Sequence, residues 1–219
     1  SIRSQETSSA RNIRATLGRR NRAVTEDTTA VNDDNPHPTD SNLLPGLTLV
    51  LGGARSGKSH HAETLIAGHI DASASIMRPT YIATAEAGDG EMVTRIAQHR
   101  ARRGDHWHTE ETLLALADTI VAATSDGQPA LVDCLTLWLS NAMHAELDLN
   151  AETATLLDAF THAKGPVVCV SNEVGLGIVP DNALARAFRD AAGRLNQQVA
   201  AQADRVDFIA AGLPITLKS

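Results

Sequence analysis

Cysteine, basic charge and long apolar runs are all scarce in this 219-residue chain, and each shortage excludes a class of protein. Its two cysteines, Cys134 and Cys169, lie in apolar runs, where a free thiol behaves as a small hydrophobe. This usage predicts no disulfide framework and favours a reducing, cytoplasmic setting. No stretch of about eighteen apolar residues predicts a membrane span, and we expect no secretory signal.

The net charge of −7 and the sequence pI of about 5.7 argue against the broad basic surface that nucleic-acid binding requires. We therefore expect no nucleic-acid partner, whereas a local basic site for a nucleotide stays open. Apolar residues make up 42% of the chain, which is enough for one domain with a sizeable core. The histidines outside the motifs described below lack the spacing of a zinc site; they include His60, His61, His106 and His108.

Residues 1–45 differ from the rest of the chain in composition. They are rich in Ser, Thr, Asn, Asp and Arg, contain three prolines and show no sustained hydrophobic period. This composition predicts a flexible, disordered extension ahead of a domain over 46–219. The Arg-rich opening also fits a targeting peptide, but the acidic residues that follow and the lack of an amphipathic face favour a plain extension.

From Leu47 onward, short apolar strands alternate with longer helical stretches, which is typical of an α/β domain with a mainly parallel sheet flanked by helices. The predicted strands cover 47–52, 80–84, 130–134, 166–171 and 206–210, with a short terminal strand over 215–217. The predicted helices cover 58–68, 89–102, 112–124, 136–146, 151–163 and 181–203, and Asp181 is expected to cap the last of them.

The most specific single motif is a phosphate-binding loop. It matches GxxxxGK[ST] between a predicted strand and a predicted helix, and its residues are Gly52, Gly53, Ala54, Arg55, Ser56, Gly57, Lys58 and Ser59. Glycines let successive N–H groups turn toward phosphate oxygens, and the following helix adds the positive end of its dipole. Lys58 is predicted to reach the β- and γ-phosphates and Ser59 to hold Mg²⁺. The alternative, an ordinary glycine-rich turn, is disfavoured by the flanking strand and helix.

Polar residues at the carboxyl ends of the other strands are further candidates, because ligands of parallel α/β sheets bind there. Asp133 follows an apolar strand, as the magnesium-holding Asp of phosphate-loop proteins does; the alternative role is a cap of the next turn. The small residues Ala83, Thr84 and Ala85 allow close approach of a nucleotide or simply form a tight turn. Glu173 is predicted either to orient a nucleophile or contact a metal-bound water, or else, together with Asn172, to satisfy loop backbone or a subunit contact. The residues favour neither role.

His99, in the predicted helix 89–102, is a candidate catalytic residue. It shares one helix face with Glu91 and Arg95, at intervals of four residues. A lone helical histidine is usually a surface residue, but three neighbouring arginines suit the phosphates of a nucleotide; they are Arg100, Arg102 and Arg103.

Several separated blocks, in the same order, strongly resemble the bifunctional adenosylcobinamide kinase/adenosylcobinamide-phosphate guanylyltransferase family of cobalamin biosynthesis. They are Gly52-Gly-Ala-Arg-Ser-Gly-Lys-Ser59, Tyr81-Ile-Ala-Thr-Ala85, Arg95-Ile-Ala-Gln-His-Arg100 and Ser171-Asn-Glu-Val-Gly-Leu-Gly-Ile-Val-Pro180, with Leu184-Ala-Arg186, Phe188-Arg-Asp190 and Gly193-Arg-Leu-Asn-Gln197. The resemblance spans Leu47 to the C-terminus and leaves the extension without a functional explanation.

The resemblance implies a RecA-like P-loop domain that performs two reactions. ATP or GTP phosphorylates adenosylcobinamide, and GMP then passes from GTP to adenosylcobinamide phosphate through a guanylylated histidine, which corresponds to His99. Some relatives have two histidines where this chain has Gln98-His99. The resemblance also implies Mg²⁺ as cofactor, a homotrimer, and nucleotide contacts from the phosphate loop, Ala83, Thr84, Ala85, Arg100, Ala101, Arg102, Arg103, Glu111 and Asp133.

The residues by themselves are also compatible with two other functions. A simple P-loop small-molecule kinase needs only the phosphate loop and Asp133, with His99 on the surface. A non-catalytic nucleotide switch needs the loop and a segment that orders on binding.

Overall fold

The structure is a computed structural model, and it describes residues 43–73, 78–85 and 106–219. These residues belong to one compact unit, His37–Ser219. The predicted extension over 1–45 lies outside the described residues except for 43–45, and the predicted helix 89–102 lies outside them entirely. The domain boundary therefore stays a prediction.

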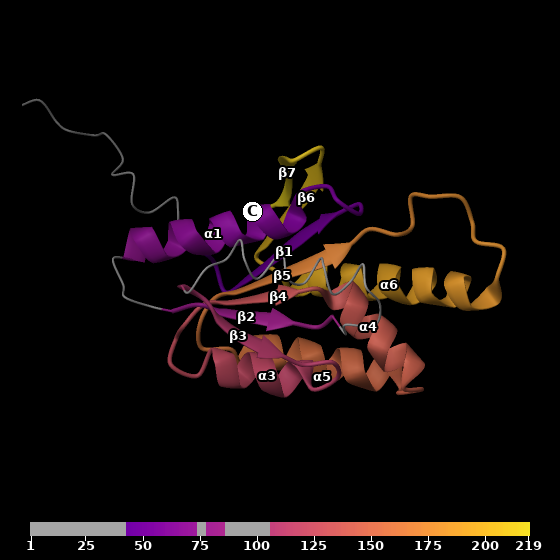
Figure 1. Ribbon diagram of the computed structural model, residues 1–219, viewed down its shortest axis with the longest axis horizontal. Coiled ribbons are helices and arrows are strands. Elements are labelled where there is room, and N and C mark those ends of the chain that lie inside the picture. Colours follow the sequence, from indigo (N-terminus) through magenta and orange to yellow (C-terminus); the bar gives the residue numbers. More distant parts are fainter. Residues whose placement is uncertain (1–42, 74–77, 86–105) are drawn as a thin grey trace, which may run out of the picture. The chain divides into compact units, whose positions relative to one another are not determined.

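The described strands form a seven-stranded sheet in the order β3-β2-β4-β5-β1-β6-β7 (Figure 1). Each neighbouring pair is parallel except β6 and β7, which are antiparallel. This arrangement confirms the predicted α/β fold with a mainly parallel sheet. The strands are β1 (Leu47–Gly52), β2 (Thr80–Ala83), β3 (His108–Glu111), β4 (Ala130–Asp133), β5 (Val167–Asn172), β6 (Arg205–Ala210) and β7 (Leu213–Lys218).

Helices cover both faces of the sheet (Figure 1). The described helices are α1 (Lys58–Ser73), α3 (Leu116–Ala123), α4 (Leu135–His144), α5 (Leu149–His162) and α6 (Ala183–Gln202). Helix α1 packs on one face through Ala62 and Ile66, and the other four share a larger core on the opposite face. Strand β1 is buried along its whole length, as expected for a parallel strand covered on both sides.

Several predicted boundaries are wrong, for different physical reasons. The helix predicted over 112–124 begins only at Leu116, because the Thr112 N–H donates to the Ala83 carbonyl and continues the sheet pairing. Asn182, and not Asp181, caps α6: its Oδ1 accepts from the Ala185 N–H at 2.7 Å. Strand β3 was not predicted, since its residues are His, Thr, Glu and Glu.

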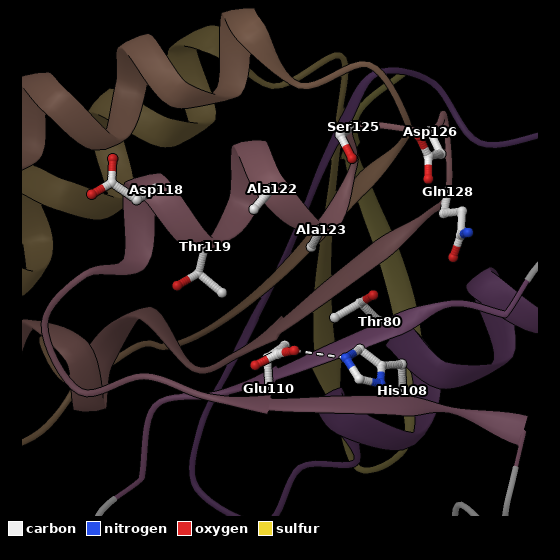
Figure 2. A pocket seen from close by; sticks show the side chains of 10 residues that line it. All are labelled: Thr80, His108, Glu110, Asp118, Thr119, Ala122, Ala123, Ser125, Asp126 and Gln128. Carbon is white, nitrogen blue, oxygen red and sulfur yellow. Dashed lines mark hydrogen bonds and ion pairs between the residues drawn. The ribbon is translucent and has the colours of Figure 1, made fainter.

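A hollow of about 510 Å³ lies between β3 and α3 (Figure 2). Thr80 and His108 begin their strands, and Gln128 precedes β4, so much of the hollow lies toward the amino ends of these strands. The lining is polar, with His108 Nε2 2.6 Å from Glu110 Oε1, and it contains none of the predicted site residues. The lining residues are Thr80, His108, Glu110, Asp118, Thr119, Ala122, Ala123, Ser125, Asp126 and Gln128.

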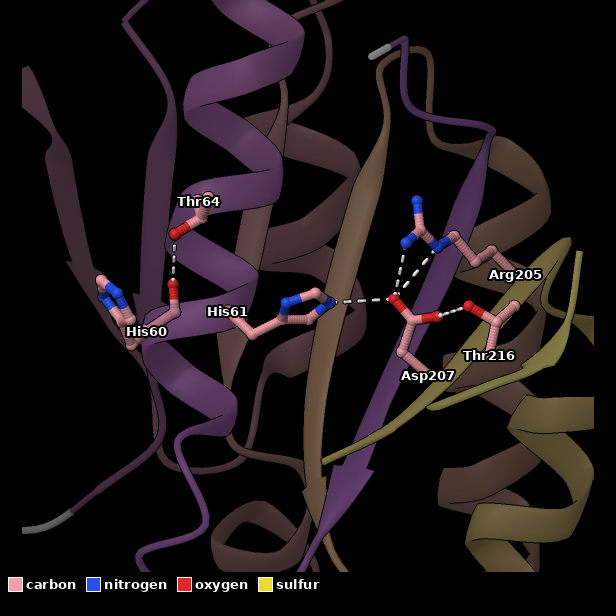
Figure 3. Close-up of polar contacts among 6 residues, drawn as sticks. All are labelled: His60, His61, Thr64, Arg205, Asp207 and Thr216. Atoms are coloured by element: carbon pink, nitrogen blue, oxygen red, sulfur yellow. Dashed lines mark hydrogen bonds and ion pairs between the residues drawn. The ribbon is translucent and has the colours of Figure 1, made fainter. Parts of the chain in front are cut away.

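Asp207 joins β6 to β7 and to α1 through a cluster of polar contacts (Figure 3). Its side chain is fully buried, and its Oδ2 lies 2.9 Å from His61 Nε2 and 3.0 Å from Arg205 Nε. Thr216 on β7 donates to Oδ1 at 3.0 Å. Burial raises the pKa of this carboxyl, but hydrogen bonds from His61, Arg205 and Thr216 and the Arg205 charge outweigh it, so the pKa lies below its ordinary value.

The lowered pKa of Asp207 predicts a pH-dependent contribution to stability. As the pH falls, the Asp207 carboxyl takes up its proton at a higher pH in the unfolded chain than in the folded chain. The stabilisation from the ionised carboxylate is therefore complete above the ordinary pKa of 3.8, and it disappears as the pH falls through the lower pKa of the folded state. The unfolding free energies of the wild type and Asp207→Asn should differ most at neutral pH and converge below about pH 4. Urea denaturation across this range tests the prediction, and a difference independent of pH would contradict it.

Candidate functional site

The predicted phosphate loop connects the end of β1 to the start of α1. The backbone takes positive φ values at Gly52 (152°), Arg55 (57°) and Gly57 (102°), which turn the chain sharply over six residues. The Ser56 N–H donates to the Gly53 carbonyl at 3.3 Å, and the His61 N–H donates to the Gly57 carbonyl at 3.0 Å, closing the first turn of the helix. The loop therefore lies at the carboxyl edge of the sheet, with a helix N-terminus beside it, as an anion-binding loop requires.

Two glycines of the motif are required by close packing against the β6–β7 hairpin. A Cβ on Gly52 would lie 2.5 Å from the Ile209 carbonyl oxygen, and one on Gly57 would lie 3.2 Å from Gly212 Cα. Both residues also have positive φ, which L side chains rarely adopt. Gly53 differs, because no heavy atom lies within 4 Å of its added Cβ. Gly53 fills a variable position of GxxxxGK[ST], and the packing of the described residues leaves room for a side chain there.

Lys58 is the buried cation of the loop. It is 6% exposed, and its Nζ donates to the Gly53 carbonyl at 2.5 Å, so the ammonium group lies against its own loop. The Ser56 Oγ is buried and has no hydrogen-bond partner among the described residues. Buried hydroxyls normally have a partner, so this group is suited to a ligand or a water molecule. Ser59 is half-buried in the first turn of α1.

Asp133 ends β4, two strands away from β1. Alternation along β4 places its side chain on the same face as Leu131, which packs in the core beneath α1. The Tyr81 hydroxyl donates to Asp133 Oδ2 at 2.5 Å, which holds the carboxyl group in place at the end of β4. Tyr81 lies inside one of the motif blocks, but its link to Asp133 depends on strand pairing that the sequence does not show.

Three predicted nucleotide contacts, Glu111, Ala83 and Asp133, lie side by side at the ends of neighbouring strands. Ala83 pairs with Asp133 on one side and with Glu111 on the other, so the ends of three strands form one row. The Thr84 hydroxyl accepts from the Cys134 N–H and donates to the Cys134 carbonyl, both at 2.8 Å, and its side chain is fully buried. Thr84 thus fixes the backbone immediately after Asp133.

Glu173, in the segment after β5, makes a contact with loop backbone, as one of its predicted roles requires; its other predicted role stays a prediction. Glu173 Oε1 accepts from the Gly175 N–H at 2.5 Å, which satisfies loop backbone. Ser171 donates to Asn196 Oδ1 on α6 at 2.6 Å, and Thr136 on α4 accepts from the Asn172 N–H at 2.7 Å. This buried polar network was not predicted, because its members lie up to sixty residues apart in the sequence.

Both cysteine thiols are free and buried, as predicted. Burial raises the pKa of each, and Cys134, which also lies beside the Asp133 charge, reaches about 11. Cys134 lies just beyond β4 as the N-cap of α4, not inside a strand. Both thiols therefore stay protonated near neutral pH and act as packing groups.

The remaining predicted residues, His99, Arg100, Ala101, Arg102 and Arg103, lie outside the described residues. Within the described part of the chain, no group of three or more His, Cys, Asp or Glu side chains could hold a metal ion. Ser59 and Asp133 instead offer the hydroxyl and carboxylate oxygens that suit Mg²⁺, which takes most ligands from phosphates and water. These donors fit a nucleotide-bound Mg²⁺. None of the described helices is long and apolar enough to cross a membrane.

A phosphate loop at the carboxyl edge of a parallel sheet, with an acidic residue ending another strand, defines a P-loop nucleotide-binding protein. The family model for cobinamide kinase / cobinamide phosphate guanyltransferase matches residues 48–217, and the chain belongs to this family. The family resemblance drawn from the sequence motifs is confirmed, and with it the prediction of an enzyme.

Two bifunctional adenosylcobalamin biosynthesis proteins illustrate the similarity. CobP of Pseudomonas aeruginosa is 49% identical over 172 residues, covering 78% of this chain and 96% of that protein. CobU of Escherichia coli is 40% identical over 187 residues, covering 78% and 99%. Among solved structures, the flagellar accessory protein FlaH of Methanocaldococcus jannaschii aligns with a TM-score of 0.47 at 15% identity over 80% of each chain, a likeness that supports no functional statement.

Replacing Gly52 by alanine should destabilise the protein, whereas the same change at Gly53 should not. The new Cβ at position 52 meets a backbone carbonyl that cannot move aside, and overpacking of this kind costs about 1–3 kcal/mol. Gly53→Ala meets open space and should change the unfolding free energy by less than about 0.5 kcal/mol. Chemical denaturation of the two variants measures both values, and equal losses would contradict the packing argument.

Proposed function

We propose that this enzyme phosphorylates adenosylcobinamide with ATP or GTP and then transfers GMP from GTP to adenosylcobinamide phosphate, giving adenosylcobinamide-GDP. The observation that carries the proposal is the 49% identity to a bifunctional relative over 96% of that relative's length. The phosphate loop and Asp133 supply the local geometry that such chemistry requires.

In the proposed kinase step, the substrate hydroxyl oxygen bonds to the γ-phosphorus of the nucleoside triphosphate. The bond from that phosphorus to the β,γ-bridging oxygen breaks, the nucleoside diphosphate leaves, and the hydroxyl proton passes to a nearby base or to water. Loop N–H groups and the Lys58 ammonium would hold the phosphates and offset the charge that develops on them. Mg²⁺ bound by Ser59 and Asp133 would supply further charge neutralisation at the phosphates.

In the proposed transferase step, an imidazole nitrogen of His99 bonds to the α-phosphorus of GTP. The bond to pyrophosphate breaks and leaves a phosphoramidate that carries GMP. A phosphate oxygen of adenosylcobinamide phosphate then bonds to the same phosphorus, and the P–N bond breaks to release His99. Neutral imidazole is available for this role because its ordinary pKa is about 6.5. The arginines proposed to balance the pyrophosphate charge are Arg100, Arg102 and Arg103.

The family resemblance also implies a homotrimer and a nucleotide site that includes Ala83, Thr84, Ala85, Ala101 and Glu111. A cytoplasmic location agrees with the two protonated, unpaired thiols. These assignments stay predictions.

Incubation with α-labelled GTP tests the guanylyl-histidine directly. Wild-type protein should retain label that is acid-labile and base-stable, as expected of a phosphoramidate, and His99→Ala should retain none. His106→Ala, which removes an exposed histidine of the described structure, is the matched control and should be labelled like the wild type. His99→Ala should keep kinase activity. Lys58→Ala should lower the rate of the kinase reaction by about 100-fold or more, which is the scale expected when a charge-stabilising group is removed.

The outcomes separate the alternatives. Label on His99→Ala would show that another residue is the nucleophile. Phosphorylation without any label on the wild type would indicate a simple P-loop kinase, and nucleotide binding without either activity would indicate a switch. Loss of both activities in a folded His99→Ala variant would contradict the separation of the two steps.

A further inference from the structure

The β6–β7 hairpin touches the phosphate loop through backbone atoms. The Gly212 N–H, in the turn between the two strands, donates to the Ser56 carbonyl at 2.8 Å. The Ile209 carbonyl lies where a side chain on Gly52 would be, and Gly212 Cα lies against Gly57. This hairpin therefore forms one wall of the loop, although no predicted nucleotide contact comes from it.

His61 adds a side-chain link between the same hairpin and the start of α1 (Figure 3). It belongs to the first turn of the helix, where its N–H donates to the Gly57 carbonyl. Its ring, with 17% of the side chain exposed, reaches across to Asp207 Oδ2 at 2.9 Å. Asp207 pairs in register with Val50 of β1, the strand that leads into the loop. Asp207 is thus connected to both ends of the loop, to β1 through strand pairing and to α1 through its carboxylate.

The position of Asp207 is itself fixed from two sides. Arg205 donates from Nε to Oδ2 at 3.0 Å, its Nη2 forms an ion pair with the same oxygen at 2.9 Å, and Thr216 donates to Oδ1. The Asp207 carboxylate is therefore held in place and cannot move together with α1. Its contact with His61 restrains the position of the first turn of α1. The adjacent His60 shows the contrast: its ring is exposed, and Figure 3 shows it pointing away from the cluster.

We propose that His61 is a positioning residue for nucleotide binding, which fastens the first turn of α1 to Asp207 and so holds Lys58 and the loop N–H groups in the geometry that receives phosphates. The proposal rests on the proposed function, since it assumes that this loop binds the nucleotide. The physical reason is preorganisation: a loop already held in its binding geometry loses less conformational entropy when the ligand arrives. His61 itself needs no contact with the nucleotide.

Calorimetric binding of ATP in the presence of magnesium, with the full chain, tests this role. His61→Ala should raise the dissociation constant about tenfold, equivalent to about 1.4 kcal/mol, while His60→Ala should stay within about twofold of the wild type. His61→Gln keeps an amide N–H at the reach of Nε2 and should recover most of the affinity, whereas the shorter His61→Asn should not.

Asp148→Ala separates positioning from general stability. It removes the N-cap of α5, which packs on the opposite face of the sheet from α1, so it should lower the melting temperature yet leave the dissociation constant within about twofold. If His61→Ala fails to fold, the comparison of the dissociation constants of His61→Gln and His61→Asn still tests the proposal. Equal binding by these two variants, or a loss of affinity in Asp148→Ala equal to that in His61→Ala, would overturn the proposal. Absence of binding by the wild type would instead contradict the proposed function.

Discussion

The close approach between the phosphate loop and the β6–β7 hairpin is the contact on which the rest of the site depends. Gly52 lies so near the Ile209 carbonyl that no Cβ fits between them. The Gly212 N–H, in the turn between β6 and β7, donates a hydrogen bond to the loop. Because β6 pairs with β1 in parallel, the same pairing that builds the sheet sets the position of the loop relative to the carboxyl ends of the other strands.

The acidic side of the site is held by a different set of contacts. Tyr81 holds the Asp133 carboxylate, and the Thr84 hydroxyl fixes the backbone directly after it. Strand β5 lies between β4 and β1, and its end is fastened to α4 and α6 by the buried network of Thr136, Ser171 and Asn196. Asp133 and the phosphate loop therefore lie at the same carboxyl edge of the sheet, although their strands, β4 and β1, are not neighbours. Each is held in place by its own set of contacts. Such preorganised supports are what a site for charge-stabilising chemistry requires.

The sequence predicted the parts of this structure that local pattern determines. The phosphate loop, the buried strands and most helices follow from hydrophobic period and glycine placement, and Asp133 follows from its place at the end of an apolar run. Strand β3 was not predicted because its four residues are polar and show no apolar pattern. Its backbone pairing with β2 is what makes it a strand. The cap of α6 shifted by one residue because Asp181 and Asn182 both suit the role, and only the backbone geometry distinguishes them. The contacts between the hairpin and the loop and the His61–Asp207 link join residues about 150 positions apart, which no local pattern can show.

Charge explains why an acidic chain can nonetheless present a phosphate site. The formal net charge is −7, yet the groups arranged at the loop are backbone N–H dipoles and one buried ammonium, and their attraction for an anion acts over a few ångströms. Because surface charges are screened beyond about 10 Å at ordinary salt, the acidic surface elsewhere opposes this attraction only weakly. Asp133 ends β4 at the same carboxyl edge of the sheet, and the Tyr81 hydroxyl holds its carboxyl group in place. In the function that we propose, Mg²⁺ would lie between this carboxylate and the nucleotide phosphates, because a cation there would offset the repulsion between two negative groups.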